Sequence, residues 1–236
     1  MSGVNNTKTL QYSSVEQGPT LEETGRDVGV VEIITSISHS QVAVTGEANH
    51  AGTTSMALRQ DAFMGAAEFA LALESAARGR ATETAAIGTV GKVEARPNGT
   101  NVVPEDVTLG VDTRDTDEQS RRTLINGMRE RGGEIADDRD LGFEWEDLLD
   151  VSATPMDEEV VETLDDACGT VGIESTRMPS GAGHDAMNVA RATPTGMLFI
   201  PSEDGISHSP VEYTPPKNLA NGARVLERGL RSLASV

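Results

Sequence analysis

The chain contains little cysteine and no long apolar segment. Cys168 is the only cysteine among 236 residues, so an internal disulfide is impossible and a reducing compartment is expected. No apolar run approaches the roughly 18 residues that a membrane-spanning helix needs, and the polar start of the chain does not resemble a signal peptide. The sequence therefore predicts a cytoplasmic protein that does not enter a membrane.

Positive charge is also scarce. The chain has 19 basic residues, of which only three are lysines, against 38 acidic residues, and its net charge is −19. This charge opposes binding to nucleic acids and to anionic membranes, so neither is expected as a partner. An acidic, lysine-poor surface favours adaptation to high salt, where screening removes the self-repulsion. An ordinary acidic cytosolic protein is the alternative.

The middle of the chain alternates between strand and helix patterns. Strands are expected at 41–47, 85–95, 106–114 and 142–150, and helices at 59–78 and 117–132. Thr116 is the expected N-cap of the second helix. This βαββαβ order predicts a ferredoxin-like fold, with one four-stranded antiparallel sheet and two helices on one of its faces.

The remaining segments predict an α/β layer. Strands are expected at 27–37 and 197–200, and helices at 157–172, from about 184, and at 216–232. His39 is expected in a polar turn after the first of these strands. The acidic pair Glu158-Glu159 falls in the first turn of a helix, where acids stabilise the helix dipole, and is interpreted as structural.

Two loops carry polar side chains that could bind a ligand. His50 lies in a tight turn of small residues after a strand, and Asn101 and Arg114 surround a later turn and strand. By themselves these patterns also fit a surface histidine and an ion pair of Arg114 with Asp112 or Asp115. Arg114 follows Asn101 by thirteen residues, and we expect the intervening strand to place both at the same end of the sheet.

Five short blocks of residues follow one another along the chain and are considered together. They are EQGP at 16–19, GEANHAGTTSM at 46–56, RPNGTNVVP at 96–104 followed by VDTR at 111–114, SGAGHDA at 180–186, and FIPSEDGISHSPVE at 199–212. From about Glu16 to its end the chain resembles the hydantoinase/carbamoylase group of amidohydrolases, within the M20 family of dinuclear-metal aminoacylases and peptidases. The resemblance implies a lid and dimerisation domain at 37–152, with parts of an α/β metallohydrolase catalytic domain at 1–36 and 153–236.

The resemblance also implies roles for individual residues. His208 would bind metal, and Gln17, His50, Asn101, Arg114 and Gly183 would bind substrate. His50 would act in catalysis by donating to a carbonyl oxygen as it becomes an oxyanion. The guanidinium of arginine suits a carboxylate, and a glycine N–H near a helix N-terminus suits an anion. His184 is expected to have a packing role.

The resemblance fails at the metal centre. The family binds two divalent ions (Zn, Mn or Co) per intact site, and at one ligand position where it has histidine this chain has Ser14. A second histidine, an aspartate and a glutamate pair belong to a preceding half that this sequence does not contain. The expected protein is thus a truncated amidohydrolase, acting when intact on N-carbamoyl-amino acids or related ureido acids and releasing CO₂ and ammonia.

Two alternative functions and a homodimer are also considered. The chain could instead be an aminoacylase or metallopeptidase of the same larger family, or a non-catalytic dimerisation fragment. A homodimer is expected through strand 41–47 or helix 59–78.

Overall fold

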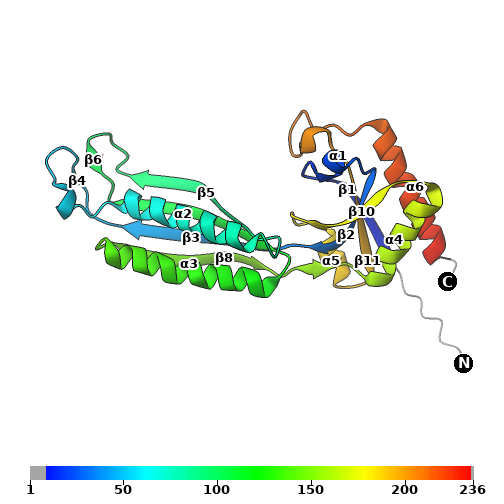
Figure 1. Ribbon diagram of the computed structural model, residues 1–236, viewed down its shortest axis with the longest axis horizontal. Coiled ribbons are helices and arrows are strands. Elements are labelled where there is room, and N and C mark those ends of the chain that lie inside the picture. Colours follow the sequence, from blue (N-terminus) through cyan, green and yellow to red (C-terminus); the bar gives the residue numbers. More distant parts are fainter. Residues whose placement is uncertain (1–8, 235–236) are drawn as a thin grey trace, which may run out of the picture. The chain divides into compact units, whose positions relative to one another are not determined.

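A computed structural model describes residues 9–234, which form two compact units (Figure 1). The central unit is Ser36–Ala153, and the flanking unit combines the chain up to Thr35 with the chain from Thr154 onward. Within residues 9–234, no helix has both the length and the apolar character to cross a membrane.

The central unit is a four-stranded sheet covered on one face by two helices. Its strands, in spatial order, are β5 (Ile87–Arg96), β7 (Asp106–Asp115), β3 (Ser36–Thr45) and β8 (Gly142–Val151), and its helices are α2 (Ala62–Arg80) and α3 (Glu118–Asp138). Every neighbouring pair is antiparallel. The predicted ferredoxin-like fold is confirmed, because this order and direction are those of the split βαββαβ unit.

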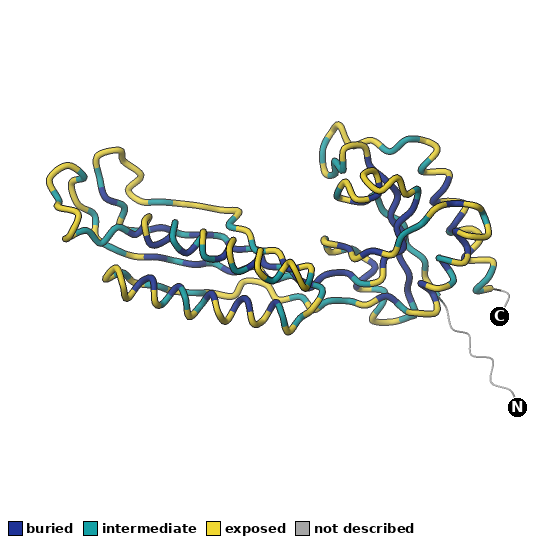
Figure 2. The backbone as a smooth tube through the Cα atoms, viewed as in Figure 1, coloured by how far each residue is buried: buried dark blue, intermediate teal, exposed yellow. Residues whose placement is uncertain are grey.

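Alternation along the strands explains why only one face is covered. Residues of β7 alternate without exception between buried and half-buried positions, and the buried ones pack against the helices (Figure 2). The core between sheet and helices includes Val42, Leu109, Phe69 and Leu124. The opposite face of the sheet carries polar side chains and no helix of this unit.

Three local expectations were wrong in detail. His39 lies inside β3 rather than in a turn, because the strand begins at Ser36. The N-cap of α3 is Asp117 rather than Thr116, since the Asp117 carboxylate accepts hydrogen bonds from the backbone N–H groups of Gln119 and Ser120. Asp61 caps α2 in the same way, so that helix begins at Ala62 and not near residue 59.

The flanking unit is a mixed sheet packed against helices. Its main strands, in spatial order, are β1 (Leu10–Val15), β11 (Thr195–Ile200), β2 (Val28–Ile34) and β10 (Ser175–Ser180), and β9 (Thr154–Pro155) pairs with β2. Its helices are α1 (Thr20–Thr24), α4 (Glu158–Val171), α5 (Ala186–Ala190) and α6 (Pro216–Leu233). All six residues of β11 are buried, as expected of the innermost strands of an α/β layer.

Two loops of the flanking unit meet beyond the ends of β1 and β11. These strands are parallel neighbours, so the loops that follow them leave the sheet at the same edge. Gly205, in the loop after β11, has φ +65°, and a Cβ there would lie 2.6 Å from the carbonyl carbon of Gly18. Only glycine permits both this backbone conformation and this approach. The contact joins the loop after β1 to the loop that carries His208.

Candidate functional site

A cavity of about 370 Å³ lies among these loops of the flanking unit. It is lined by Tyr12, Ser14, Val15, Gln17, Gly183, His184, Asp185, Ser207, His208 and Glu212. The cavity therefore gathers the residues of this unit that the sequence singled out: Gln17, Gly183 and His208, together with Ser14. They come from three separate blocks of the sequence, and their convergence is the main result of the fold for this unit.

One side of β1 forms a wall of the cavity. Tyr12 and Ser14 alternate with Gln11 and Ser13, whose side chains lie toward glycines of α6. Ser14 pairs in register with Phe199 of β11. The position where the resemblance predicts a metal-binding histidine thus faces the cavity, but it presents a hydroxyl instead of an imidazole.

The loop after β11 holds His208 in a constrained conformation. Its φ is +55°, a region that non-glycine residues seldom occupy. Its backbone N–H donates to the Glu212 carboxylate at 2.8 Å, and its Nδ1 lies 3.1 Å from the Ser207 hydroxyl. Nε2 is the ring nitrogen that remains for another partner. Residues held in such sparsely populated backbone conformations cluster at binding and active sites.

His184 is half-buried beside this loop. Its ring lies 5.5 Å from that of Phe199 and 6.3 Å from that of Tyr12, centroid to centroid, which fits the expected packing role. Burial lowers the pKa of His184 below its usual range. Its Nε2 is buried without a hydrogen-bond partner among the described residues.

The donors near His208 do not complete a metal centre. Between residues 9 and 234, no three or more His, Cys, Asp or Glu side chains are grouped so that they could hold a metal ion. His208 alone supplies an imidazole suited to Zn²⁺ or a similar ion. The described residues therefore do not by themselves fit the two-metal site that the resemblance implies.

Gly183 lines the cavity, but not at the start of a substantial helix. The helix expected from about residue 184 begins at Ala186 and has five residues, and its N-cap Asp185 makes no side-chain capping bond. Few aligned peptides contribute to its dipole, so the predicted anion site at a helix N-terminus is weakened. Gly183 is itself an exposed residue of the cavity wall.

In the central unit, His50 and Asn101 are brought together by a small two-stranded ribbon. Its strands are β4 (Asn49–His50) and β6 (Val102–Val103). The N–H of Ala51 donates to the Asn101 carbonyl at 2.9 Å. His50 Nδ1 accepts the N–H of Gly52 at 3.0 Å, so in the neutral ring Nε2 must carry the proton. The exposed imidazole thus presents an N–H donor, which is the form its expected role requires.

Arg114 lies at the other end of the sheet, contrary to expectation. In β7 it is opposite Ile37 and Ile87, whereas Asp106 is at the end from which β6 and β4 extend (Figure 1). Eight residues of extended strand cover about 27 Å. Asn101 and Arg114 therefore cannot meet in one chain, because β7 is unbroken and stretches the thirteen-residue spacing along its length.

The Arg114 guanidinium is held by Asp112 on the open face of the sheet. Nε and Nη2 donate to the two oxygens of Asp112 at 2.9 and 2.7 Å, and His39 Nε2 lies 3.2 Å from one of them. Burial alone would raise the pKa of Asp112, but the hydrogen bonds and charges of Arg114 and His39 outweigh it and lower that pKa. The ion pair considered from the sequence is therefore present.

Three polar residues that support the site were missed in the sequence. Glu16 is buried and accepts the N–H groups of Thr20 and Leu21, so it anchors the start of α1 beside Gln17. Glu212 fixes the backbone of His208, and Arg59 donates to the carbonyls of the His50 turn. An acid shortly before a helix could have indicated the first role, whereas nothing periodic marks the other two.

Comparison with known proteins identifies the family of the chain. The model of peptidase family M20/M25/M40 matches residues 6–232. The chain is 38% identical to the allantoate amidohydrolase of Escherichia coli over 220 residues, covering 93% of this chain and 53% of that protein. It is 36% identical to the N-carbamoyl-L-amino acid amidohydrolase of Geobacillus stearothermophilus, with the same two coverages.

Solved structures give the same result for the fold. A hydantoinase/carbamoylase family amidase from Burkholderia multivorans superimposes with a TM-score of 0.91 at 32% identity, over 95% of this chain and 54% of that one. The chain spans about half the length of the curated relatives it matches. By sequence and by fold, the chain belongs to peptidase family M20/M25/M40, and it has similar proteins among the amidohydrolases and the hydantoinase/carbamoylase family amidases.

Proposed function

We propose that this chain supplies the substrate-holding part of an amidohydrolase that cleaves non-peptide C–N bonds of N-carbamoyl-amino acids or related ureido acids. The observation that carries the proposal is the cavity in which Gln17, Gly183 and His208 converge. The allantoate and N-carbamoyl-amino acid relatives are named for substrates of this chemistry. No feature of the structure favours the aminoacylase or metallopeptidase alternative over it.

Each proposed residue has a distinct task. His50, through its Nε2–H, donates to the carbonyl oxygen as negative charge develops there, which lowers the barrier most where water is excluded. The Arg114 fork and the Asn101 amide bind the substrate carboxylate, and Gln17 and the Gly183 N–H bind the ureido group. His208 is proposed as a ligand of one divalent ion (Zn, Mn or Co), and the other donors must come from outside residues 9–234.

A homodimer is part of this proposal. Strand β3 lies between β7 and β8, so residues 41–47 cannot pair edge to edge with a second copy, and only β5 and β8 have open edges. Large apolar side chains are exposed on α2 and β5, namely Phe63, Met64, Leu71, Ile87 and Val93. We place the two-fold contact on this side. His50 and Asn101 of one protomer would then act with the Arg114 of its partner.

The interface can be tested by light scattering in high salt. Leu71→Glu should convert dimer to monomer, whereas Leu148→Glu, a similarly exposed apolar position on the opposite edge strand β8, should leave the dimer intact. A wild-type chain that remains monomeric well above micromolar concentration would refute the dimer. Equal effects of the two substitutions would place the contact elsewhere.

Cytoplasmic location and adaptation to high salt are proposed with the function. The single, buried cysteine suits a reducing environment. The net charge of −19 with three lysines suits a medium in which charge is screened.

A chimeric enzyme tests the proposed activity. The portion of the E. coli allantoate amidohydrolase that this chain does not match is joined to it, and Ser14 is replaced by His. With added Zn²⁺, Mn²⁺ or Co²⁺ we expect ammonia release from N-carbamoyl-L-amino acids or allantoate, and little hydrolysis of N-acetyl-amino acids or dipeptides. A folded, metal-loaded chimera that prefers N-acyl-amino acids or dipeptides would show that the substrate class is wrong.

A further inference from the structure

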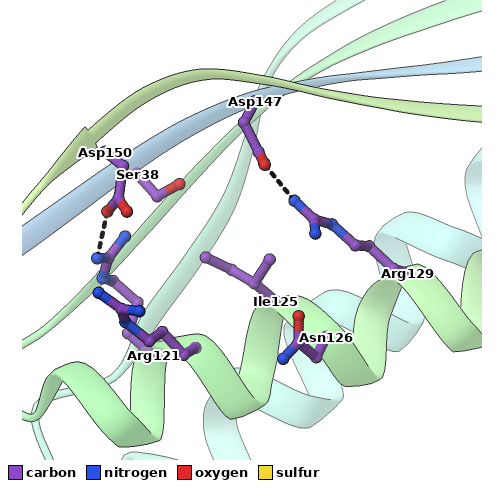
Figure 3. Close-up of a pocket in the computed structure, with 8 residues that line it drawn as sticks. Ser38, Arg121, Ile125, Asn126, Arg129, Asp147 and Asp150 are labelled. Atoms are coloured by element: carbon purple, nitrogen blue, oxygen red, sulfur yellow. Dashed lines mark hydrogen bonds and ion pairs between the residues drawn. The ribbon is translucent and has the colours of Figure 1, made fainter.

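A second cavity lies within the central unit, between α3 and β8, and takes no part in the proposed reaction. Its volume is about 200 Å³, and its lining is Ser38, Arg121, Arg122, Ile125, Asn126, Arg129, Asp147 and Asp150 (Figure 3). It opens on the helix side of the sheet, whereas Arg114 lies on the opposite, open face. The two arginine-containing regions are therefore separate.

A β-bulge shapes the strand side of this cavity. Asp150 pairs with Ser38 and Asp147 pairs with Ser40, and Leu149 pairs with His39, so Leu148 of β8 has no opposite partner. In a regular strand, side chains three residues apart face opposite sides, but the extra residue turns both aspartates toward α3. Along α3, Arg121, Ile125 and Arg129 recur at intervals of four and face them.

The carboxylates of the cavity are already engaged. Asp147 accepts hydrogen bonds from Trp145 Nε1 at 2.8 Å and from Ser40 at 3.3 Å and is ion-paired with Arg129, and the Arg129 hydrogen bond is the main reason that its pKa is lowered. Asp150 is ion-paired with Arg121. Three guanidinium groups and two carboxylates line the cavity, and a third carboxylate, that of Glu118, lies beside Arg122 just outside the lining.

Several hydrogen-bond donors of the cavity have no partner among the described residues. Ser38 is 3% exposed, its hydroxyl points toward the space in Figure 3, and it makes no side-chain hydrogen bond. Arg121 is 1% exposed, and its Nε is unpaired. Asn126 and Arg122 are exposed at the mouth of the cavity, where Arg122 lies 3.8 Å from Glu118 and the Asn126 amide has no hydrogen-bond partner among the described residues. Among these donors the buried, unpaired atoms are Arg121 Nε and, nearby, Arg129 Nε. Leaving such donors without acceptors is costly, so an occupant that supplies acceptor oxygens would be favoured.

We propose that this cavity binds a small oxyanion of the phosphate or sulfate type. Its volume is several times the roughly 30 Å³ that a water molecule occupies in the liquid, enough for a four-oxygen anion with a water. Guanidinium groups bind such oxygens with short, charge-assisted hydrogen bonds. The anion contacts Ser38 on β3 and Arg122 and Asn126 on α3, and so ties the helix to the sheet.

The direct test is calorimetric titration of the whole, metal-free chain with inorganic phosphate at constant ionic strength set with KCl. We expect one saturable site, competed by sulfate. Arg122→Gln should weaken phosphate binding about tenfold, and Ser38→Ala about three- to tenfold. The matched control is Arg78→Gln, which removes an exposed arginine with a similar i,i+4 glutamate on α2 and should leave binding unchanged.

Thermal unfolding gives an independent readout. Phosphate at saturating concentration should raise the melting temperature of the wild type and of Arg78→Gln by mass action, and should raise that of Arg122→Gln much less. The absence of saturable phosphate binding, or equal binding by all variants, would overturn the site. Succinate binding there as tightly as phosphate would overturn the assignment to tetrahedral oxyanions.

Discussion

The two units bring their proposed substrate residues into position in different ways. In the flanking unit, loops after neighbouring strands converge, so Gln17 and His208, far apart in sequence, share one cavity. In the central unit, one continuous strand separates Asn101 from Arg114, although they are only thirteen positions apart in the sequence. Loops at a sheet edge can bring distant sequence together, whereas a strand separates its residues in proportion to their spacing.

The largest expected effect concerns the cavity of the flanking unit. The purified 236-residue chain should release no ammonia from N-carbamoyl-amino acids when Zn²⁺, Mn²⁺ or Co²⁺ is added. His208 is the one side chain there that fits the expected ligand set, and one imidazole cannot hold two ions. A sensitive ammonia assay is the measurement. Metal-dependent turnover, abolished by chelation and by His208→Ala, would show that the cavity is complete without further donors.

The contact between the loops after β1 and β11 should also be easier to destabilise by a single substitution than strand β7 of the central unit. Gly205→Ala adds a Cβ at positive φ against the backbone of Gly18, and should reduce the free energy of unfolding by about 3 kcal/mol. Gly25→Ala is the matched control: its φ is +64° but no atom lies within 4 Å of the added carbon, so only the conformational cost of about 1 kcal/mol remains. Denaturant unfolding measures both. Equal losses would mean that the contact with Gly18 is not tight.

Binding of the substrate carboxylate by Arg114 on β7 should depend on the geometry of the guanidinium group and not on its charge alone. In the active chimera, Arg114→Lys keeps the charge but loses the planar fork, and a charge-assisted bidentate pair contributes about 1.5–3 kcal/mol. We expect kcat/KM for N-carbamoyl-amino acids to fall about ten- to a hundredfold.

An analogue with an amide in place of the carboxylate provides the control for Arg114. It cannot form the bidentate pair, so Arg114→Lys should affect its hydrolysis much less. If both substrates lose the same factor, Arg114 acts only as the structural partner of Asp112.

The sequence predicted the elements better than the distances between them. Alternation in 106–114 and the order of strands and helices were enough for the ferredoxin-like fold, since both follow from local periodicity. The converging blocks around Gln17 and His208 were anticipated by resemblance. The sequence did not reveal that β7 continues unbroken between Asn101 and Arg114, nor that a bulge in β8 turns Asp147 and Asp150 to one side. Both depend on pairing with distant strands.

The smallest expected effect acts on both units alike. Raising KCl from 0.1 to 1 M shortens the Debye length from about 10 to 3 Å, which screens the repulsion of the 19 excess negative charges. Salt also weakens ion pairs, but most ion pairs here are exposed and each contributes about 0–1 kcal/mol. The stability lost from weaker ion pairs should therefore not cancel the stability gained from reduced repulsion. We expect the melting temperature to rise by a few degrees, about 1–2 kcal/mol for a chain of this size.

Glu144→Gln with Glu146→Gln, which removes two exposed carboxylates of β8, should reduce this rise in melting temperature. Glu68→Gln, which breaks the ion pairs with Arg131 and Arg139, should increase it. A wild-type melting temperature that is flat or falls with salt would contradict adaptation to high salt.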